Sequence, residues 1–433
     1  MSINNKLMEF LDKSHSNFHA VNEMAMILDE QGFTHLENNQ AWDLSAKAKY
    51  YVKVNNSSIF AFDLSDYQAG MGYKIVASHT DAPTFKVKPN AVKIVNNYII
   101  VNSEAYGGLI DYTWLDRPLK LAGRVIIKED GKLVTKLYDS KKAVGIIPSL
   151  AIHMNREVNK ETKFNRHTQM RPVVGQGEEF NFKAHLANSL NVSEDAVYDY
   201  ELVFKPLEKA TYVGFNDEFV ASNHIDNLQS AYVSFEAFIN SKNNGSVNVY
   251  ASFDNEEIGS MTKQGAQATI LRDILIRISD YFKLSNEEHL ISLAKSFIVS
   301  ADNAHANHPN YLEANDENHV VSLNAGVVVK YSANQKYTTD ALSSALMQEL
   351  SKLSGAKIQA FVNRADAPGG STLGAISGTQ ISIMSVDIGL PQFAMHSSME
   401  LAGSEDSQHM LDLLQAFYNC ELIVSSDSLQ VKA

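Results

Sequence analysis

The spacing of apolar positions divides the chain into helical and extended segments. Between residues 5 and 32, apolar side chains recur every three to four positions and the pattern ends at Gly32, which predicts one or two amphipathic helices. Short runs rich in β-branched and aromatic residues follow, each bounded by polar turns, and these predict strands. The runs lie at 50–54, 58–64 and 73–78.

The pattern then changes twice. From about residue 84 to 216, polar turns separate segments typical of β-hairpins, with one helical segment among them. From 217 onward, helices and apolar strands alternate as in a three-layer α/β sheet, with strands at 247–254, 296–303 and 380–389. We therefore expect one α/β domain built from residues 1–83 and 217–433, with a β-rich domain of residues 84–216 inserted into it.

Composition and charge are those of a large packed protein. The 433 residues are 45% hydrophobic and 20% charged, and this length favours a large domain plus a smaller one. The net charge of -13, without a long run of Lys or Arg, argues against binding to nucleic acid or to anionic membranes. The single cysteine, Cys420, excludes an internal disulfide framework and a Cys-rich zinc module. No secretory signal or bilayer-spanning run is apparent, so we expect a cytoplasmic protein.

The first candidate functional residues follow the predicted strand at 73–78. His79 and Asp81 are two positions apart, so on an extended segment their side chains point to the same side. A histidine can bind a metal through one ring nitrogen while a carboxylate holds the other nitrogen. The alternative is a turn in which the two residues form an ordinary hydrogen bond.

Acidic residues occupy three further positions at the ends of predicted elements. Asp226 precedes a helical pattern, where it either caps the helix or bridges two metal ions with its two oxygens. Glu256 and Glu257 follow an apolar strand, where adjacent glutamates are unfavourable unless a cation is present or one is protonated. The alternative there is a solvated acidic loop. Asp302 stands at the carboxyl end of another apolar strand, the edge where open α/β sheets bind ligands.

Three histidines lie near these positions. His396 follows a strand-like segment and, taken alone, is more typical of a core residue. His305 and His308 follow Asp302 and fit a supporting, substrate-facing or surface role. Together with the spare carboxylate Glu256, the chain offers a set of nitrogen and oxygen ligands that suits zinc, or cobalt or manganese. The ligands in this set are His79, Asp226, Glu257, Asp302 and His396.

The order of these motifs resembles the aspartyl aminopeptidase family of dinuclear zinc exopeptidases over nearly the whole chain. The resemblance rests on SHTDAPTFKVKP, LDRPLKLAGRV, IPSLAIHMNR, DNEEIGS, SADNAHANHPNY, QKYTTDA and FAMHSSMEL. It implies a zinc-exopeptidase-like catalytic domain with an inserted dimerisation domain. It also implies an enzyme that removes N-terminal residues, with a preference for Asp or Glu, from peptides.

The implied roles divide the site between two zinc ions. Glu256 is implied to be the general base, which takes a proton from a water activated by the two ions. Asp81 is implied to orient His79. His224 departs from the pattern, because relatives more often carry an arginine there, and we assign it no role. The implied ligands are His79 and Asp302 for one ion, Glu257 and His396 for the other, and Asp226 for both.

The resemblance further implies a homo-oligomer, a dodecamer built from dimers, whose active sites face an inner cavity. His153 is then expected to reach the active site of a neighbouring subunit, and the alternative is a structural histidine in an apolar flank. An acidic substrate side chain requires a cation in the pocket wall. Three residues qualify equally on sequence, and the turn Gly369, Gly370 and Ser371 allows the backbone to approach substrate. The candidate cations are Lys330, Lys336 and Arg364.

Two other functions share parts of this pattern. A non-catalytic scaffold relative would keep the assembly but lose Glu256 or a ligand, and all of these positions are filled. A dinuclear-zinc amidohydrolase or carboxypeptidase would apply the same chemistry to N-acylated or C-terminal substrates. We favour the aminopeptidase because the resemblance continues through the insertion, where catalysis alone imposes little.

Overall fold

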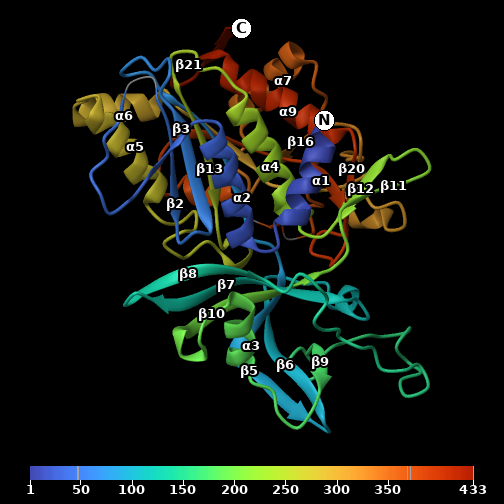
Figure 1. The fold of residues 1–433 in the computed structure, drawn as a ribbon. Coiled ribbons are helices and arrows are strands. Elements are labelled where there is room, and N and C mark those ends of the chain that lie inside the picture. Colours follow the sequence, from blue (N-terminus) through green and yellow to red (C-terminus); the bar gives the residue numbers. More distant parts are fainter. Residues whose placement is uncertain (46–47, 368, 371, 433) are drawn as a thin grey trace.

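The chain folds into a larger α/β part and a smaller β-rich part that lies beneath it in Figure 1. The structure, a computed structural model, describes residues 1–45, 48–367, 369–370 and 372–432. Within these residues, no helix is both long enough and apolar enough to cross a membrane.

The main sheet forms the centre of the larger part. Its central strands β13, β4, β14 and β18 are parallel neighbours. Every residue of β4 and β13 is buried, because helices cover both faces of the sheet. Over the described residues the strand order is β1 (Thr34–Leu36), β2 (Lys49–Val54), β3 (Ser58–Asp63), β13 (Val247–Phe253), β4 (Tyr73–His79), β14 (Phe297–Ala301), β18 (Met384–Gly389), β16 (Val327–Tyr331) and β17 (Ile358–Val362).

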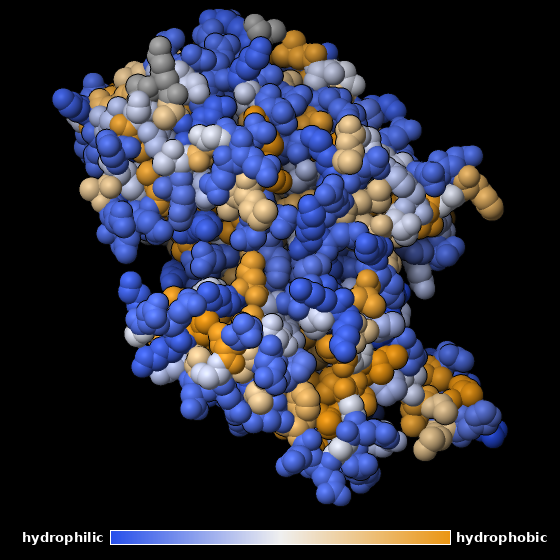
Figure 2. Space-filling view, viewed as in Figure 1, coloured by the Kyte–Doolittle hydropathy of each residue, from blue (hydrophilic) through white to orange (hydrophobic). Residues whose placement is uncertain are grey.

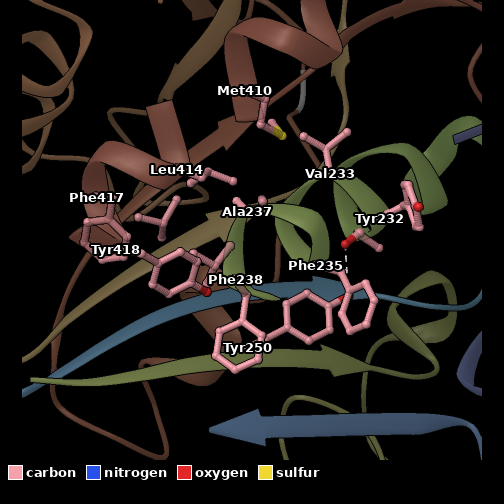
Figure 3. Packing of buried hydrophobic residues seen from close by; sticks show 14 of the residues in the cluster. Tyr232, Val233, Phe235, Ala237, Phe238, Tyr250, Met410, Leu414, Phe417 and Tyr418 are labelled. Atoms are coloured by element: carbon pink, nitrogen blue, oxygen red, sulfur yellow. Dashed lines mark hydrogen bonds between the residues drawn. The ribbon is translucent and has the colours of Figure 1, made fainter. Parts of the chain in front are cut away.

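Helices pack on the two faces of this sheet and confirm the predicted three-layer α/β arrangement. One face is covered by α1 (Ile3–Lys13), α2 (Asn17–Glu30), α4 (Ile225–Ile239), α7 (Ala341–Ser354) and α9 (Asp406–Asn419). On this face Phe235 and Phe238 of α4 contact Tyr250 of β13, and Phe238 also contacts Tyr418 of α9 (Figure 3). The other face is covered by α5 (Ile270–Tyr281), α6 (Asn286–Ala294) and α8 (Leu373–Ser377).

The smaller part is an antiparallel sheet with a hydrophobic core of its own. Two tight hairpins build it, with Asn96 and Asn97 in one turn and Asp130 and Gly131 in the other, all at positive φ as such turns require. Helix α3 (Phe182–Leu190) packs on the sheet. Over the described residues the strand order is β8 (Lys132–Asp139), β7 (Leu119–Glu129), β10 (Val197–Pro206), β5 (Thr84–Val95), β6 (Tyr98–Tyr106) and β9 (Val173–Gln176).

A third, smaller sheet joins segments that are distant in sequence. Its order over the described residues is β11 (Thr211–Val213), β12 (Phe219–Ser222), β20 (Glu400–Gly403), β19 (Pro391–Phe393) and β15 (Ala304–His305). β11 lies in the range that we assigned to the insertion, yet it pairs with β12 of the larger part. The chain ends in a hairpin of β21 (Glu421–Val424) and β22 (Leu429–Lys432). Short 3-10 helices are η1 (Asp111–Trp114), η2 (Glu194–Ala196), η3 (Glu256–Ile258) and η4 (Leu312–Ala314).

Candidate metal centre

The five expected ligands come together at one edge of the main sheet. β4, β13 and β14 are parallel, so their carboxyl ends meet there. β4 ends with His79, η3 with Glu257 follows β13, and Asp302 directly follows β14. Asp226 comes from the first turn of α4, and His396 from the loop between β19 and β20.

Asp226 lies between the two histidines. Its Oδ1 is 3.7 Å from His79 Nε2, and its Oδ2 is 3.4 Å from His396 Nε2. Asp302 Oδ1 lies 3.4 Å from His79 Nε2, and Glu257 Oε1 lies 3.3 Å from His396 Nε2. The atoms therefore form two sets: the His79 half (His79, Asp302 and Asp226 Oδ1) and the His396 half (His396, Glu257 and Asp226 Oδ2). The halves adjoin, since His79, Asp226 and Glu257 offer atoms that all lie within 4.8 Å of one another.

Each imidazole ring is held through its Nδ1 atom. His79 Nδ1 lies 3.1 Å from the backbone oxygen of Asp81 and 3.3 Å from Asp81 Oδ1. His396 Nδ1 lies 2.9 Å from the backbone oxygen of Gly108. Metal-binding histidines commonly donate their second ring N–H to a carboxylate or a carbonyl in this way. Both rings therefore turn Nε2 toward the carboxylates.

Glu400 supports the site and was not identified from the sequence. Its carboxylate accepts hydrogen bonds from the backbone N–H of Asp226, at 3.1 Å, and of His396, at 2.7 Å. Burial, with Asp226 nearby, raises the pKa of Glu400 to about 8. The signal for it was its place in the motif FAMHSSMEL, four residues after His396.

The charges and unpaired atoms of the site fit a metal ion. Among the described residues, the buried oxygens Asp226 Oδ1 and Glu257 Oε1 have no hydrogen-bond partner. Burial raises the pKa of Glu257 to about 7 and that of Glu256 to about 9, so these carboxylates need a nearby positive charge to ionise at neutral pH. Burial opposes a charged His396, but Asp226 and Glu257 outweigh it and raise its pKa to about 11. Imidazole and carboxylate donors of this kind suit zinc.

The surroundings of the acidic residues differ from those of the two alternatives, a helix cap at Asp226 and a solvated loop at Glu256 and Glu257. α4 begins with a kink in which Asp226 and Asn227 are not helical, no side chain caps its first residue, and Asp226 Oδ1 has no hydrogen-bond partner among the described residues. The side chains of Glu256 and Glu257 are 14% and 5% exposed, so the turn that carries them is not a solvated loop.

A cavity of about 360 Å³ opens beside the ligands. Glu256 lines it, and its Oε2 lies 4.0 Å from His79 Nε2. The Glu256 carboxylate therefore faces the space next to the ligand atoms without being one of their closest partners. Gly370 also lines the cavity, Gly369 lines a neighbouring one, and Ser371 lies outside the described residues. Other lining residues are Asn303, Ala304, His305, Lys330, Tyr337, Phe361, Thr372 and Met395.

The remaining candidate histidines differ in position. His305 lines the site cavity, whereas His308 is not among its described lining residues. His224 is buried and lines a separate cavity, and its Nε2 has no hydrogen-bond partner among the described residues. His153 is exposed in the turn at 152–154 and does not line the site cavity within the described part of this chain.

Comparisons with known proteins find a family and relatives that match nearly the whole chain. The family described as "Aminopeptidase I zinc metalloprotease (M18)" matches residues 10–418. A "Probable M18 family aminopeptidase 2" of Clostridium acetobutylicum is 41% identical over 424 residues, which cover 96% of this chain and 98% of the relative.

Solved structures show the same fold. A chain in the "Cryo-EM structure of the Ape4 and Nbr1 complex" matches with a TM-score of 0.93 and 35% identity, covering 96% of this chain and 85% of that one. A chain of the S. cerevisiae mApe1 dodecamer matches with a TM-score of 0.84 and 25% identity, covering 96% of both chains. The family match and the bacterial relative both span nearly the full length, and the protein therefore belongs to the M18 family of zinc metalloprotease aminopeptidases.

Proposed function

We propose that this aminopeptidase works with two metal ions, one in the His79 half and one in the His396 half. The observation that carries the proposal is the division of the Asp226 carboxylate, with Oδ1 toward His79 and Oδ2 toward His396. In a site for a single ion, the Nε2 atoms of both histidines would point at the same ion, whereas here each lies near a different oxygen of Asp226. Zinc is the ion that the family description names.

The residues around the halves would carry out the hydrolysis. Metal ions of this kind supply Lewis acidity, which polarises a scissile carbonyl and lowers the pKa of water. Glu256 would take the proton from the attacking water and pass it to the leaving amine, as a general base and then a general acid. Asp81 would keep His79 oriented through the contacts at Nδ1. Glu256 suits the proton transfer because its side chain lines the cavity beside both halves.

An acidic N-terminal residue is the substrate that the cavity would accept best. Among its described lining residues, Lys330 is the one lysine or arginine. Its ammonium group lies 3.7 Å from Asp302 Oδ2, donates to the backbone oxygen of Asn303 at 2.7 Å, and lies over the Tyr337 ring at 5.5 Å. A buried cation beside the ligands would pair with a substrate carboxylate.

The other two candidate cations lie outside this cavity. Lys336 is exposed and lines a neighbouring cavity. Arg364 also lines that neighbouring cavity, and its guanidinium is paired with Asp366 at 2.7 Å. Lys330 is therefore our choice among the three.

The protein would act as an oligomer built from copies of this chain. The matched yeast structure is a dodecamer, and Figure 2 shows apolar side chains gathered on the visible face of the smaller part. His153 stands between Ile152 and Met154, which are 47% and 73% exposed, and exposed apolar groups of this kind mark contact surfaces. A neighbouring subunit that covers this turn would bring His153 toward a second active site. The cytoplasmic location stays a prediction.

A panel of aminoacyl anilides tests the activity and its specificity. The chelated protein would be reloaded with zinc, manganese or cobalt and assayed with Asp, Glu, Leu and Ala substrates and their N-acetylated forms. We expect hydrolysis only with metal and only of free amines, with Asp or Glu fastest. Cleavage of the acetylated forms would instead favour an amidohydrolase, and a molar mass of a single chain in light scattering would contradict the oligomer.

A further inference from the structure

The last residue of β6 and the two that follow it reach from the antiparallel sheet of the smaller part, here called the inserted sheet, to both halves of the metal centre. They are Tyr106, Gly107 and Gly108, and we call them the 106–108 strap. The inserted sheet provides none of the five expected ligands, all of which lie in the larger part. The strap therefore connects the inserted sheet directly to the residues that surround the candidate ligands.

Tyr106 contacts the His79 half through Asp81. Its hydroxyl lies 2.7 Å from Asp81 Oδ2 and receives a hydrogen bond of 2.8 Å from Asn255 Nδ2. Asn255 Oδ1 already accepts from Thr262 Oγ1 and from Gln264 Nε2, each at 2.8 Å, so the Asn255 amide must turn its NH₂ group toward Tyr106. The single hydroxyl proton of Tyr106 is thus directed to Asp81.

Tyr106 is one of three hydrogen-bond donors to the Asp81 carboxylate. Asp81 Oδ1 accepts from the backbone N–H of Glu256 at 3.1 Å, and Asp81 Oδ2 from that of Glu257 at 3.2 Å. Tyr106 supplies the shortest of these three bonds, from outside the segment that carries the glutamates. Burial, with Asp81 beside it, raises the pKa of Tyr106 well above the usual value, so the phenol remains a donor at any working pH.

The same strap holds the His396 half. The backbone oxygen of Gly108 lies 2.9 Å from His396 Nδ1, and two residues beyond the strap the backbone N–H of Ile110 donates to the backbone oxygen of His396 at 3.1 Å. Between Tyr106 and Gly108 the chain passes close to Glu257: a Cβ atom on Gly107 would lie 3.2 Å from the Glu257 Cβ. Gly107 also has a φ of 74°, which favours glycine.

We propose that the 106–108 strap positions both metal-binding histidines, and that Tyr106 is a positioning residue for His79 through Asp81. The inference rests on the proposed two-metal site and assigns the inserted sheet a role in that site beyond assembly. Partners of metal-binding histidines typically change metal affinity by about 10- to 100-fold when they are replaced. Loss of the Tyr106 hydroxyl should act on that scale.

The test compares Tyr106→Phe with Tyr98→Phe. Both residues lie on β6, and Tyr98 is 48% exposed at the opposite end of the strand. Each protein is loaded with zinc, and the release of zinc to excess chelator is followed. We expect Tyr106→Phe to release one of its two ions about 10- to 100-fold faster and Tyr98→Phe to match wild type. Equal release from Tyr106→Phe and wild type would overturn the inference, and so would equally fast release from both variants.

A double-mutant cycle separates positioning from general loosening of the fold. If Tyr106 acts through Asp81, the variant with both Tyr106→Phe and Asp81→Asn should release zinc at the rate of Asp81→Asn alone. Independent, multiplying effects would contradict that route. Cobalt-loaded Tyr106→Phe should also show an altered visible spectrum, which a distant structural defect would leave unchanged. If the wild-type protein did not retain two ions, that result would instead contradict the proposed two-metal function itself.

Discussion

The His79 half and the His396 half of the site use the same kinds of ligand atom in different surroundings. The side chain of His79 is 1% exposed, whereas that of His396 is 29% exposed. Behind the His79 ring lie both the backbone oxygen of Asp81, at 3.1 Å, and its carboxylate, at 3.3 Å, whereas Gly108 lies behind the His396 ring with a neutral backbone carbonyl. A charged acceptor forms the stronger hydrogen bond and makes the imidazole a better ligand. Two halves built from the same kinds of donor atom need not bind a metal ion with equal affinity.

The stronger hydrogen bond behind His79 favours tighter metal binding in the His79 half, and the positive charge of Lys330 opposes it. The Lys330 ammonium lies 3.7 Å from Asp302 Oδ2, and a cation there weakens the attraction of a second cation to the His79 half. Burial would raise the pKa of Asp302, but Lys330 and His79 outweigh burial and hold it well below its usual value. Asp302 therefore stays ionised with Oδ1 directed at His79, 3.4 Å away. We expect the ion in the His79 half to be the tighter one.

We predict the strongest loss of activity for a change at Glu256, because this residue is proposed to move a proton and not to bind metal. Glu256→Gln removes the proton acceptor but keeps the size of the side chain, so kcat should fall by about 10²- to 10⁴-fold while two zinc ions per chain remain. The matched change Glu257→Gln, one residue along the same turn, alters a proposed ligand and should lower the zinc content. Metal analysis and kinetics on the two variants check this. Near-normal turnover by Glu256→Gln would show that another group takes the proton.

Replacing each histidine tests the inequality of the halves directly. Wild-type protein should release zinc in two phases, and His396→Ala should lack the faster phase while His79→Ala lacks the slower one. Loss of a direct ligand should lower the metal affinity of that half by more than about 100-fold, since the loss of a supporting group alone lowers metal affinity by about 10- to 100-fold. His308→Ala, which changes a histidine outside the set of ligands, is the control. The reverse assignment of the phases would mean that the charge of Lys330 outweighs the burial of His79.

The sequence predicts some strands of the fold better than others, because the signals in a sequence are local. The strands at 50–54, 58–64 and 73–78 recur within one residue as β2, β3 and β4, since continuous apolar runs mark buried strands. The predicted run at 380–389 forms a strand only from Met384. The strands of the third sheet contain two to four residues each, too few for any period to appear.

The same limit applies to the candidate site. His79, Glu257 and Asp302 stand at strand ends, where polar residues after apolar ones are visible in sequence. Tyr106 supports the site only because distant segments of the chain meet, and no spacing along the chain records that meeting. Glu400 lies four residues after His396, but its contact with Asp226 is likewise a long-range one. Sequence reasoning therefore singles out the candidate ligands more readily than the groups that hold them.

We predict a weaker effect for a change at Lys330, whose positive charge opposes the binding of a cation in the His79 half. Lys330→Met keeps the length of the side chain but removes the cation, so the ratio of kcat/KM for Asp over Leu substrates should fall by about 10- to 100-fold. Lys336→Met, in the neighbouring cavity, should leave the ratio unchanged. A ratio is the right measure because Lys330 also donates to Asn303, and general damage would slow both substrates alike. An unchanged ratio, together with slower zinc release from the His79 half, would mean that Lys330 acts on Asp302 and its ion rather than on the substrate.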